Sequence, residues 1–314
     1  MIVCVAGNPS IDRLFEVDRL AHGDIHRPQH FVALPGGKGI HVAQVATALG
    51  SEAIATGILA GHAGRWLVEE LVAEGVSTRF VWSAGETRSS LSVADRETGR
   101  LTEFYESGTP VSADAWRELE ELASGLLEDA SWLALAGSLP PGAPDDGYGR
   151  LISVARRAGV ATALDSRGDA LARSIDDHPK LVKINAHEAG QLLDRSISSI
   201  DEAHDAALAI NRRAGGTGHA TVVTMGEQGL VAIDPAGTVR HARTHARGRY
   251  PVGSGDALLA GLLVALERGD PWPVALALAL GAAAANAETP GAGHLDPARA
   301  RQLAAQADIR ELSE

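Results

Sequence analysis

The sequence predicts an α/β protein in which helices cover both faces of a mainly parallel sheet, with a small second sheet beside it. Three observations favour this class. Short apolar or β-branched runs alternate with longer helical patterns, which is the βαβ order of parallel sheets. Three later runs are separated only by short turns that contain glycine, which predicts an antiparallel edge. Two segments do not fit the alternation and predict the second sheet.

In the first two thirds of the chain the expected strands and helices alternate. We expect early strands at 2–6 and 53–59, with helices at about 39–49 and 65–73. The alternation resumes with strands at 132–136, 161–165 and 181–184, a helix near 147–157, and helices that continue to Ala214. Connections of this kind place successive strands parallel to one another.

Toward the C-terminus the pattern changes to closely spaced strands and then to helices. The runs 221–225, 230–234 and 239–243 form the predicted antiparallel meander at the sheet edge. The longest apolar stretch, 274–285, is rich in alanine and interrupted by Gly281. It is too short to span a bilayer, so it predicts a buried helix.

The predicted small sheet combines two segments that lie far apart in the sequence. These are residues 11–34 and 86–107, and the second contains a hairpin turn at 96–99. Both segments lie next to candidate site residues, which predicts a lid over the large domain formed by residues 1–10, 35–85 and 108–314. A lid with one apolar face needs a partner surface, so we expect a homodimer through the lid.

The composition argues against several classes of partner. The formal net charge is -12 and the isoelectric point is near 5.4, so neither a nucleic-acid backbone nor an anionic membrane is expected as partner. The single Cys4 lies in an apolar run and is expected to fill the core. The chain opens with a strand-like run and lacks the pattern of a secretory signal, which favours the cytoplasm.

A glycine-rich turn that leads into an apolar helix carries the strongest chemical signal, in the run Val252-Gly253-Ser254-Gly255-Asp256-Ala257. Backbone N–H groups at a helix start attract anions, and the glycines allow a phosphate to approach the backbone closely. A carboxylate at Asp256 would repel that phosphate, and a base that accepts a substrate hydroxyl proton is the economical reason for its presence. The alternative is an ordinary helix start with a favourable acidic residue.

A second glycine-rich turn surrounds a lysine, in the run Pro35-Gly36-Gly37-Lys38-Gly39-Ile40-His41. The glycines allow a polar ligand to approach, and Lys38 supplies a cation. A Walker A loop has a longer spacing between its glycines and a Ser or Thr after the lysine, so that type of loop is disfavoured. Lysine is rare here, because Lys38, Lys180 and Lys183 are the three lysines among 28 basic residues.

Six motifs in their expected order make the chain resemble ribokinase-like carbohydrate kinases of the PfkB type, particularly the branch of 1-phosphofructokinase and tagatose-6-phosphate kinase. The motifs are Asn8-Pro9-Ser10-Ile11-Asp12, Gly36-Gly37-Lys38-Gly39, Gly85-Glu86-Thr87-Arg88, Gly137-Ser138-Leu139-Pro140-Pro141-Gly142, Lys183-Ile184-Asn185 with Glu188, and Val252-Gly253-Ser254-Gly255-Asp256. The resemblance runs nearly end to end. It implies a ribokinase-like three-layer sandwich with a mainly parallel central sheet and a small β-sheet lid.

The resemblance also implies roles for the matching residues. On the acceptor side, sugar hydroxyls would be bound by Asp12, with Gly37, Lys38 and His41 in the same pocket, and a phosphate on the substrate would be held by Arg27, Arg88 and Ser138. On the nucleotide side, ATP would be contacted by Lys183, Thr224, Gly226, Gly255 and Asn286, and Mg²⁺ would be organised through water by Asn185 and Glu188. Asp256 would be the base, beside an anion hole formed by Gly253, Ser254 and Gly255.

Local structure offers simpler explanations for some of these residues. Asn185 and Glu188 have the spacing of a capping box, which explains both without a metal. Local structure also allows surface arginines at Arg27 and Arg88, a turn start at Ser138, and a buried helix-end residue at Asn286.

The chain departs from the branch pattern on the substrate side. His41 stands where Asn is usual, and it changes charge near neutrality. Further differences are Ser89 and Ser90, the stretch 103–108 with Tyr105, Ile184, and Arg167 where a small residue is common.

These observations lead to one expected function and two alternatives. Mg²⁺-ATP would transfer its γ-phosphoryl group to a phosphorylated ketohexose, with fructose 1-phosphate converted to fructose 1,6-bisphosphate. One alternative is a kinase of the same fold that acts on tagatose 6-phosphate, fructose 6-phosphate, or an unphosphorylated sugar or nucleoside, prompted by His41 and Tyr105. The second is a nucleotide-binding regulator that has lost catalysis.

Overall fold

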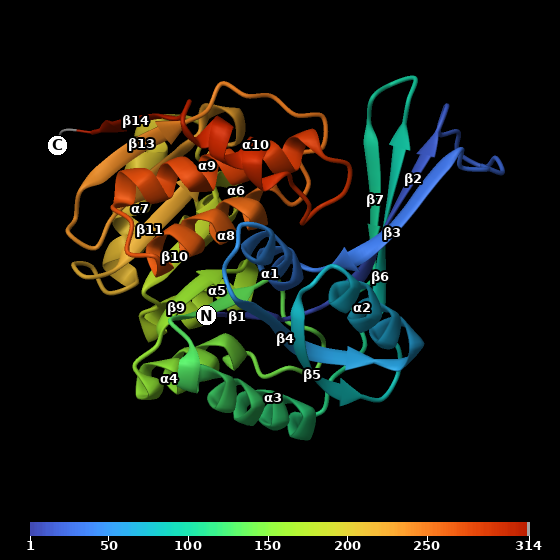
Figure 1. The fold of residues 1–314 in the computed structure, drawn as a ribbon, viewed down its shortest axis with the longest axis horizontal. Coiled ribbons are helices and arrows are strands. Elements are labelled where there is room, and N and C mark those ends of the chain that lie inside the picture. Colours follow the sequence, from blue (N-terminus) through green and yellow to red (C-terminus); the bar gives the residue numbers. More distant parts are fainter. Residues whose placement is uncertain (313–314) are drawn as a thin grey trace.

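Two sheets organise the molecule, and the smaller one projects from the side of the larger (Figure 1). The computed structural model describes residues 1–312. The large sheet has ten strands in the order β14-β13-β12-β11-β10-β9-β8-β1-β4-β5, and the small sheet has four in the order β3-β2-β6-β7. The predicted division into a mainly parallel sheet and a small β-sheet lid is therefore confirmed.

Seven strands of the large sheet run parallel to one another. They are β1 (Ile2–Ala6), β4 (Ala53–Ala60), β5 (Ser77–Ser83), β8 (Trp132–Ala136), β9 (Ala161–Asp165), β10 (Leu181–Asn185) and β11 (Ala220–Thr224). All but β5 were predicted as strands, although the run 221–225 was predicted only as part of the antiparallel meander; β11 pairs parallel with β10 and antiparallel with β12. Strand β5 lies at the edge of the sheet and has a mixed pattern of exposed and buried residues, so it lacks the continuous apolar run of its neighbours.

The opposite edge is the predicted antiparallel meander. It consists of β12 (Leu230–Ile233), β13 (Val239–Arg243) and a further strand, β14 (Asp308–Glu311). The polar sequence of β14 carries no strand signal, so the expectation of helices alone after the meander is wrong at this point. Its strand conformation comes from pairing with β13, which is a tertiary effect.

Helices cover both faces of the large sheet, in three layers. One face carries α1 (Lys38–Ala48), α2 (Gly61–Ala73), α8 (Ser254–Glu267), α9 (Trp272–Glu288) and α10 (Pro297–Ala304). The other carries α3 (Ala113–Leu126), α4 (Gly147–Ala158), α5 (Gly168–Ser174), α6 (Ala186–Leu193) and α7 (Ile200–Arg213). Short 3-10 turns occupy Leu127–Asp129, Ile175–Asp177 and Gly226–Gln228.

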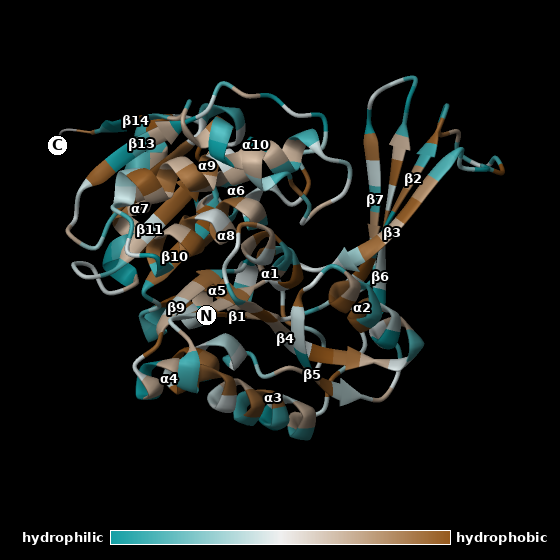
Figure 2. Ribbon diagram, in the orientation of Figure 1, coloured by the Kyte–Doolittle hydropathy of each residue, from teal (hydrophilic) through white to brown (hydrophobic). Residues whose placement is uncertain are grey.

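The core consists of two apolar layers, one on each side of the sheet. In β1, Ile2 and Cys4 face one layer while Val3 and Val5 face the other, as the two-residue period of a strand requires. The hydropathy colouring shows the central strands as predominantly apolar (Figure 2). Helix α9 is buried along most of its length, as predicted, and within residues 1–312 no helix is long and apolar enough to cross a bilayer.

The small sheet consists of β2 (Ser10–Val17), β3 (His30–Gly36), β6 (Arg88–Asp95) and β7 (Leu101–Tyr105). Its two halves meet where β2 runs parallel to β6. The predicted hairpin turn joins β6 to β7, and the N–H of Gly99 donates to the carbonyl of Asp95 at 2.8 Å. Several large apolar side chains of this sheet are exposed, including Phe31 and Phe104.

Candidate active site

The carboxyl ends of the parallel strands point toward one cavity of about 1000 Å³. In the sheet, β1 lies between β4 and β8. The chain first adds β4 and β5 on one side of β1 and then adds β8 and β9 on the other side, so the strand order reverses at β1. Ligands of open α/β sheets bind at such points. The site residues predicted from the sequence line this cavity, with the exceptions of Arg27, Glu188 and Asn286.

Asp256 lies in the first turn of α8 and is buried. The helix begins after Gly253, whose φ of 79° belongs to the left-handed region that favours glycine, and a Cβ there would lie 2.5 Å from Ala292. The N–H groups of Ser254 and Asp256 are used within the turn, by Pro251 and Gly253. In the described part of the chain the N–H groups of Gly253 and Gly255 have no such partner, so they can bind an anion.

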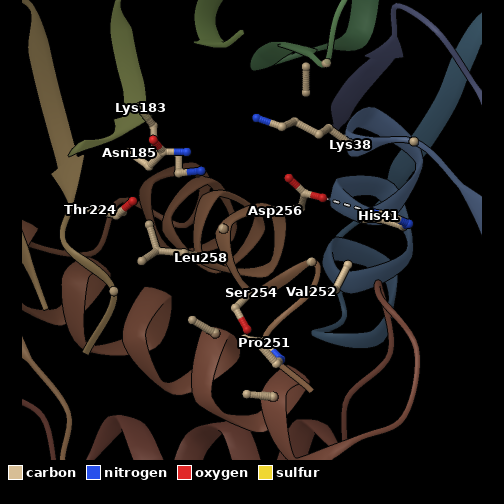
Figure 3. A pocket seen from close by; sticks show the side chains of 18 of the residues that line it. Lys38, His41, Lys183, Asn185, Thr224, Pro251, Val252, Ser254, Asp256 and Leu258 are labelled. Atoms are coloured by element: carbon tan, nitrogen blue, oxygen red, sulfur yellow. Dashed lines mark hydrogen bonds and ion pairs between the residues drawn. The ribbon is translucent and has the colours of Figure 1, made fainter. Parts of the chain in front are cut away.

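His41 connects Asp256 to Asp12 across the cavity floor. Its Nδ1 donates to Oδ2 of Asp256 at 2.8 Å, and its Nε2 lies 3.4 Å from Oδ2 of Asp12. The second contact has ion-pair distance but not the geometry of a hydrogen bond, since Nε2 lacks a hydrogen-bond partner among residues 1–312. Figure 3 shows the second Asp256 oxygen pointing away from His41 into the cavity.

Asp12 is held by three neighbours. Ser10 and Ser90 donate their hydroxyls to Oδ1 of Asp12 at 2.7 and 2.6 Å. Burial raises the pKa of Asp12, but the contact with the His41 ring and its charge, together with the hydrogen bonds from the two serines, outweigh it and leave the pKa below its usual value. Asp12 is therefore an anion fixed in orientation, as a ligand for sugar hydroxyls should be.

Asp165, at the end of β9, joins the two site lysines. Lys38 donates to its Oδ1 and Lys183 to its Oδ2, each at 2.7 Å. Asp165 has no exposed surface, so burial raises its pKa, but the charges of Lys183 and Lys38 outweigh this and lower the pKa. Asp165 was not among the predicted site residues. The available signal was a charged residue that ends an otherwise apolar strand at the carboxyl edge of the sheet.

Asn185 and Glu188 form the capping box that their spacing allowed. The Asn185 side chain accepts from the N–H of Glu188, and Oε2 of Glu188 accepts from the N–H of Asn185, both at 2.9 Å. Oε1 of Glu188 lies 3.4 Å from Nζ of Lys38. Asn185 also lines the main cavity, whereas Glu188 lines an adjoining hollow of about 700 Å³.

The same two residues fit Mg²⁺ only as contacts through water. No group of three or more His, Cys, Asp and Glu side chains in the described residues is arranged to hold a metal. Both oxygens of Glu188 already have partners. Because Mg²⁺ commonly keeps its waters and binds one or two carboxylates plus substrate phosphates, these residues fit an ion that arrives with a nucleotide.

Most residues predicted to contact the nucleotide or its Mg²⁺ lie along one wall of the cavity. Lys183, Asn185 and Thr224 lie opposite His41 and Asp256 (Figure 3). Gly226 lines the same wall. Asn286 is fully buried and does not line the cavity.

Asn286 supports the turn at residues 253–255 from behind. Its Nδ2 donates to the carbonyl of Val252 at 2.9 Å, and its Oδ1 accepts from the N–H of Gly293 at 3.1 Å. This placement is that of a buried helix-end residue, so its contribution to nucleotide binding would be indirect.

Two arginines line the part of the cavity that is predicted to hold the acceptor. Arg88 donates to the carbonyls of Asn8 and Glu106, and Arg167 lines the same cavity. Burial lowers the pKa of Arg88, and the charge of Arg167 contributes in the same direction, so the two cations are near each other. Arg27 lies in the exposed loop between β2 and β3 and does not reach the cavity of its own chain.

Comparison with known proteins decides the family. The model of the pfkB family of carbohydrate kinases matches residues 2–299. The chain belongs to this family. As a PfkB-family carbohydrate kinase it is a phosphotransferase, and the family implies ATP as the phosphoryl donor.

Solved structures agree with the ribokinase-like fold of this kinase. Phosphofructokinase-2 from Escherichia coli, in its tetrameric inhibited form, is 26% identical over 97% of this chain and 98% of that chain, with a TM-score of 0.88. A possible 1-phosphofructokinase from Thermotoga maritima is 21% identical over 99% of each chain, with a TM-score of 0.89. Ribokinase from Arabidopsis thaliana, in complex with ribose and ATP, is 20% identical over 96% and 98%, with a TM-score of 0.77.

Proposed function

We propose that this kinase transfers the γ-phosphoryl group of ATP to a hydroxyl of a phosphorylated ketohexose, with fructose 1-phosphate as acceptor and fructose 1,6-bisphosphate as product. The observation that carries the proposal is the pair Arg88 and Arg167 in one cavity with Asp12. Asp12 suits hydroxyl groups, and the arginines suit a phosphate that the acceptor already carries.

Arg88 has donors to spare for such a phosphate. Its three hydrogen bonds to backbone carbonyls use Nε and one N–H on each terminal nitrogen, out of five N–H groups in a guanidinium. These bonds hold the side chain in place and leave two N–H groups for a ligand. Arg167 makes no ion pair within residues 1–312, so its charge is also available, and Ser138 lines the wall beside it.

The reaction follows from the residues around Asp256. The acceptor hydroxyl gives its proton to the Asp256 oxygen that faces the cavity, while its oxygen attacks the γ-phosphorus and the bond to ADP breaks. The amides of Gly253 and Gly255 and the ammonium groups of Lys38 and Lys183 would stabilise the charge that spreads over the phosphoryl oxygens. Mg²⁺ bound to the nucleotide would neutralise part of the same charge, with Asn185 and Glu188 as contacts through water.

Fructose 6-phosphate is the second candidate acceptor, and it gives the same product through the other terminal hydroxyl. Its support is the 26% sequence identity to E. coli phosphofructokinase-2, which has been solved in complex with fructose 6-phosphate. An unphosphorylated acceptor has weaker support, from Glu103 and Glu106, whose side chains line the cavity near Arg88 and would repel a phosphate. A silent regulator would not need Asp256 in contact with a buried histidine.

An acceptor panel tests this proposal. The release of ADP would be measured with MgATP and fructose 1-phosphate, fructose 6-phosphate, tagatose 6-phosphate, fructose, ribose and adenosine. We expect kcat/KM to be highest for fructose 1-phosphate and low for every unphosphorylated compound. A ribose or nucleoside rate above that of all phosphosugars would overturn the substrate class, and no activity with any acceptor would favour the silent regulator.

A further inference from the structure

His41 occupies the centre of a buried chain of three side chains that come from three different elements. It lies on α1, Asp256 on α8 and Asp12 on β2 of the lid sheet. The imidazole is almost fully buried, with 6% of its side chain exposed. Its two ring nitrogens face the two carboxylates, Nδ1 toward Asp256 at 2.8 Å and Nε2 toward Asp12 at 3.4 Å.

The position of the ring between two carboxylates favours a positively charged imidazolium. An ionised carboxylate only accepts hydrogen bonds, and a neutral imidazole has one N–H and one lone pair. In either neutral tautomer of His41, the lone pair would face a carboxylate oxygen inside a buried site. The doubly protonated ring donates to Asp256 from Nδ1 and places a positively charged Nε2–H at ion-pair distance from Asp12, and so avoids this repulsion.

The electrostatic surroundings agree with a protonated ring. Burial lowers the pKa of His41, but the contacts with Asp12 and Asp256 and the charges of both carboxylates outweigh it and raise the pKa to about 10. Two more charged groups lie near His41: Glu74, which follows α2, and His294, which precedes α10. Glu74 accepts hydrogen bonds from the Gln44 amide at 2.6 Å and from His294 at 3.2 Å, so its negative charge largely compensates His294.

We propose that His41 is a positioning residue which, as an imidazolium, bridges Asp12 and Asp256 and directs the second oxygen of Asp256 toward the acceptor. This inference rests on the proposed role of Asp256 as the base. The ring keeps both protons throughout the reaction, because the acceptor proton goes to the free oxygen of Asp256. His41 also reduces the net charge of the three groups from -2 to -1, which lessens the repulsion of incoming phosphates.

The bridge changes the expected role of His41. The sequence predicted it as a substrate ligand, in the position where Asn is usual in the resembling branch. In this chain both ring nitrogens face carboxylates, so neither is directed at the sugar. The acceptor would then be held by Asp12, Lys38 and the arginines, with His41 acting through the two carboxylates.

The first test is spectroscopic and uses the intact wild-type kinase. The protein is labelled with ¹⁵N in its histidine rings, and the ring resonances are followed from pH 6 to pH 9. The His41 signal is assigned by its loss in His41→Asn or, if that variant does not fold, by its shift in Asp256→Asn. We expect the chemical shifts of an imidazolium with two protonated nitrogens across the range. A ring that becomes neutral below pH 8 would overturn the inference.

The second test is kinetic and separates this inference from the proposed function. In His41→Asn we expect the acid limb of the kcat profile to move upward by roughly one pH unit or more, because the base loses a neighbouring positive charge. The control is His62→Asn, since the His62 ring is 92% exposed and lies outside the cavity. An acid limb that does not move in His41→Asn would contradict the inference even if the enzyme phosphorylates fructose 1-phosphate. An imidazolium in an enzyme that phosphorylates no sugar would instead refute the proposed function alone.

Discussion

The ammonium nitrogen of Lys38 lies 2.7 Å from Oδ1 of Asp165, although 127 residues separate them in the chain. Lys183 binds the other oxygen of the same carboxylate at the same distance. One buried anion therefore holds two cations at the place where phosphates are expected. This arrangement gives both lysines a counterion in the site before a nucleotide arrives, so neither is buried without a partner.

Replacing Asp165 should therefore destabilise the fold as well as the site. In Asp165→Asn two partly or fully buried ammonium groups lose their shared counterion, and we expect a loss of about 3–5 kcal/mol in the free energy of unfolding. Urea denaturation followed by circular dichroism measures it. The matched control is Asp114→Asn, which removes an exposed carboxylate that pairs with Arg117. The control should change stability little, and an equal effect from both variants would contradict the account.

Tyr148 supports the turn that carries Ser138. The Tyr148 side chain is fully buried, and its hydroxyl donates to the carbonyl of Gly137 at 3.1 Å. That carbonyl also accepts from the Ser166 hydroxyl at 2.9 Å, so it keeps a partner when the tyrosine hydroxyl is removed. Tyr148→Phe should thus cost only about 1 kcal/mol in the free energy of unfolding. A loss above about 3 kcal/mol in urea denaturation would show that more than one hydrogen bond depends on the hydroxyl.

The protonated state of His41 predicts a pH dependence of stability. The pKa of His41 is raised on folding from 6.5 to about 10, so its contribution is fully present below pH 6.5 and is lost as the pH rises through 10. We expect the difference in unfolding free energy between wild type and His41→Asn to shrink as the pH rises from 6 to 10. Using the difference removes the other groups that titrate in this range. A difference that grows with pH would have the wrong sign.

Arg88 should affect the acceptor and not the nucleotide. Loss of a charge-assisted hydrogen bond costs about 1.5–3 kcal/mol, so Arg88→Gln should raise KM for the phosphosugar by roughly 10-fold to 150-fold while KM for ATP stays within about twofold. Steady-state kinetics with each substrate varied in turn measures both constants. Arg79→Gln is the control, because Arg79 lies on the distant edge strand β5 and donates only to the carbonyl of Thr78. Equal increases for both substrates would argue against a phosphate role for Arg88.

The sequence predicted those parts of the structure that depend on local chemistry. The two glycine-rich turns were found because a close approach to a ligand and the left-handed conformation at Gly253 both require glycine. The strand at 161–165 was found because its apolar run is bounded by turn residues. The capping box at Asn185 and Glu188 was likewise visible as a spacing, and the structure contains it.

Other parts depend on contacts between distant segments and gave no local signal. Strand β14 exists because β13 presents an edge for pairing. The residue pattern places His41 on α1 but does not say that its ring meets Asp256, since that contact depends on how α1 packs against α8. The role of Asp165 also required knowing that Lys38 and Lys183 converge from separate elements.

The central claim is that Asp256 is the base that takes the proton from the hydroxyl of the phosphosugar. The rate of phosphoryl transfer in a single turnover of Asp256→Asn tests this claim most directly. The measurement uses saturating MgATP and the best phosphosugar from the panel, after circular dichroism has verified that the variant is folded. Asparagine preserves the shape of the side chain but cannot take up the proton. We predict that the rate of phosphoryl transfer falls by about 10² to 10⁴, while phosphosugar binding is weakened far less. A transfer rate equal to that of the wild type would contradict the account.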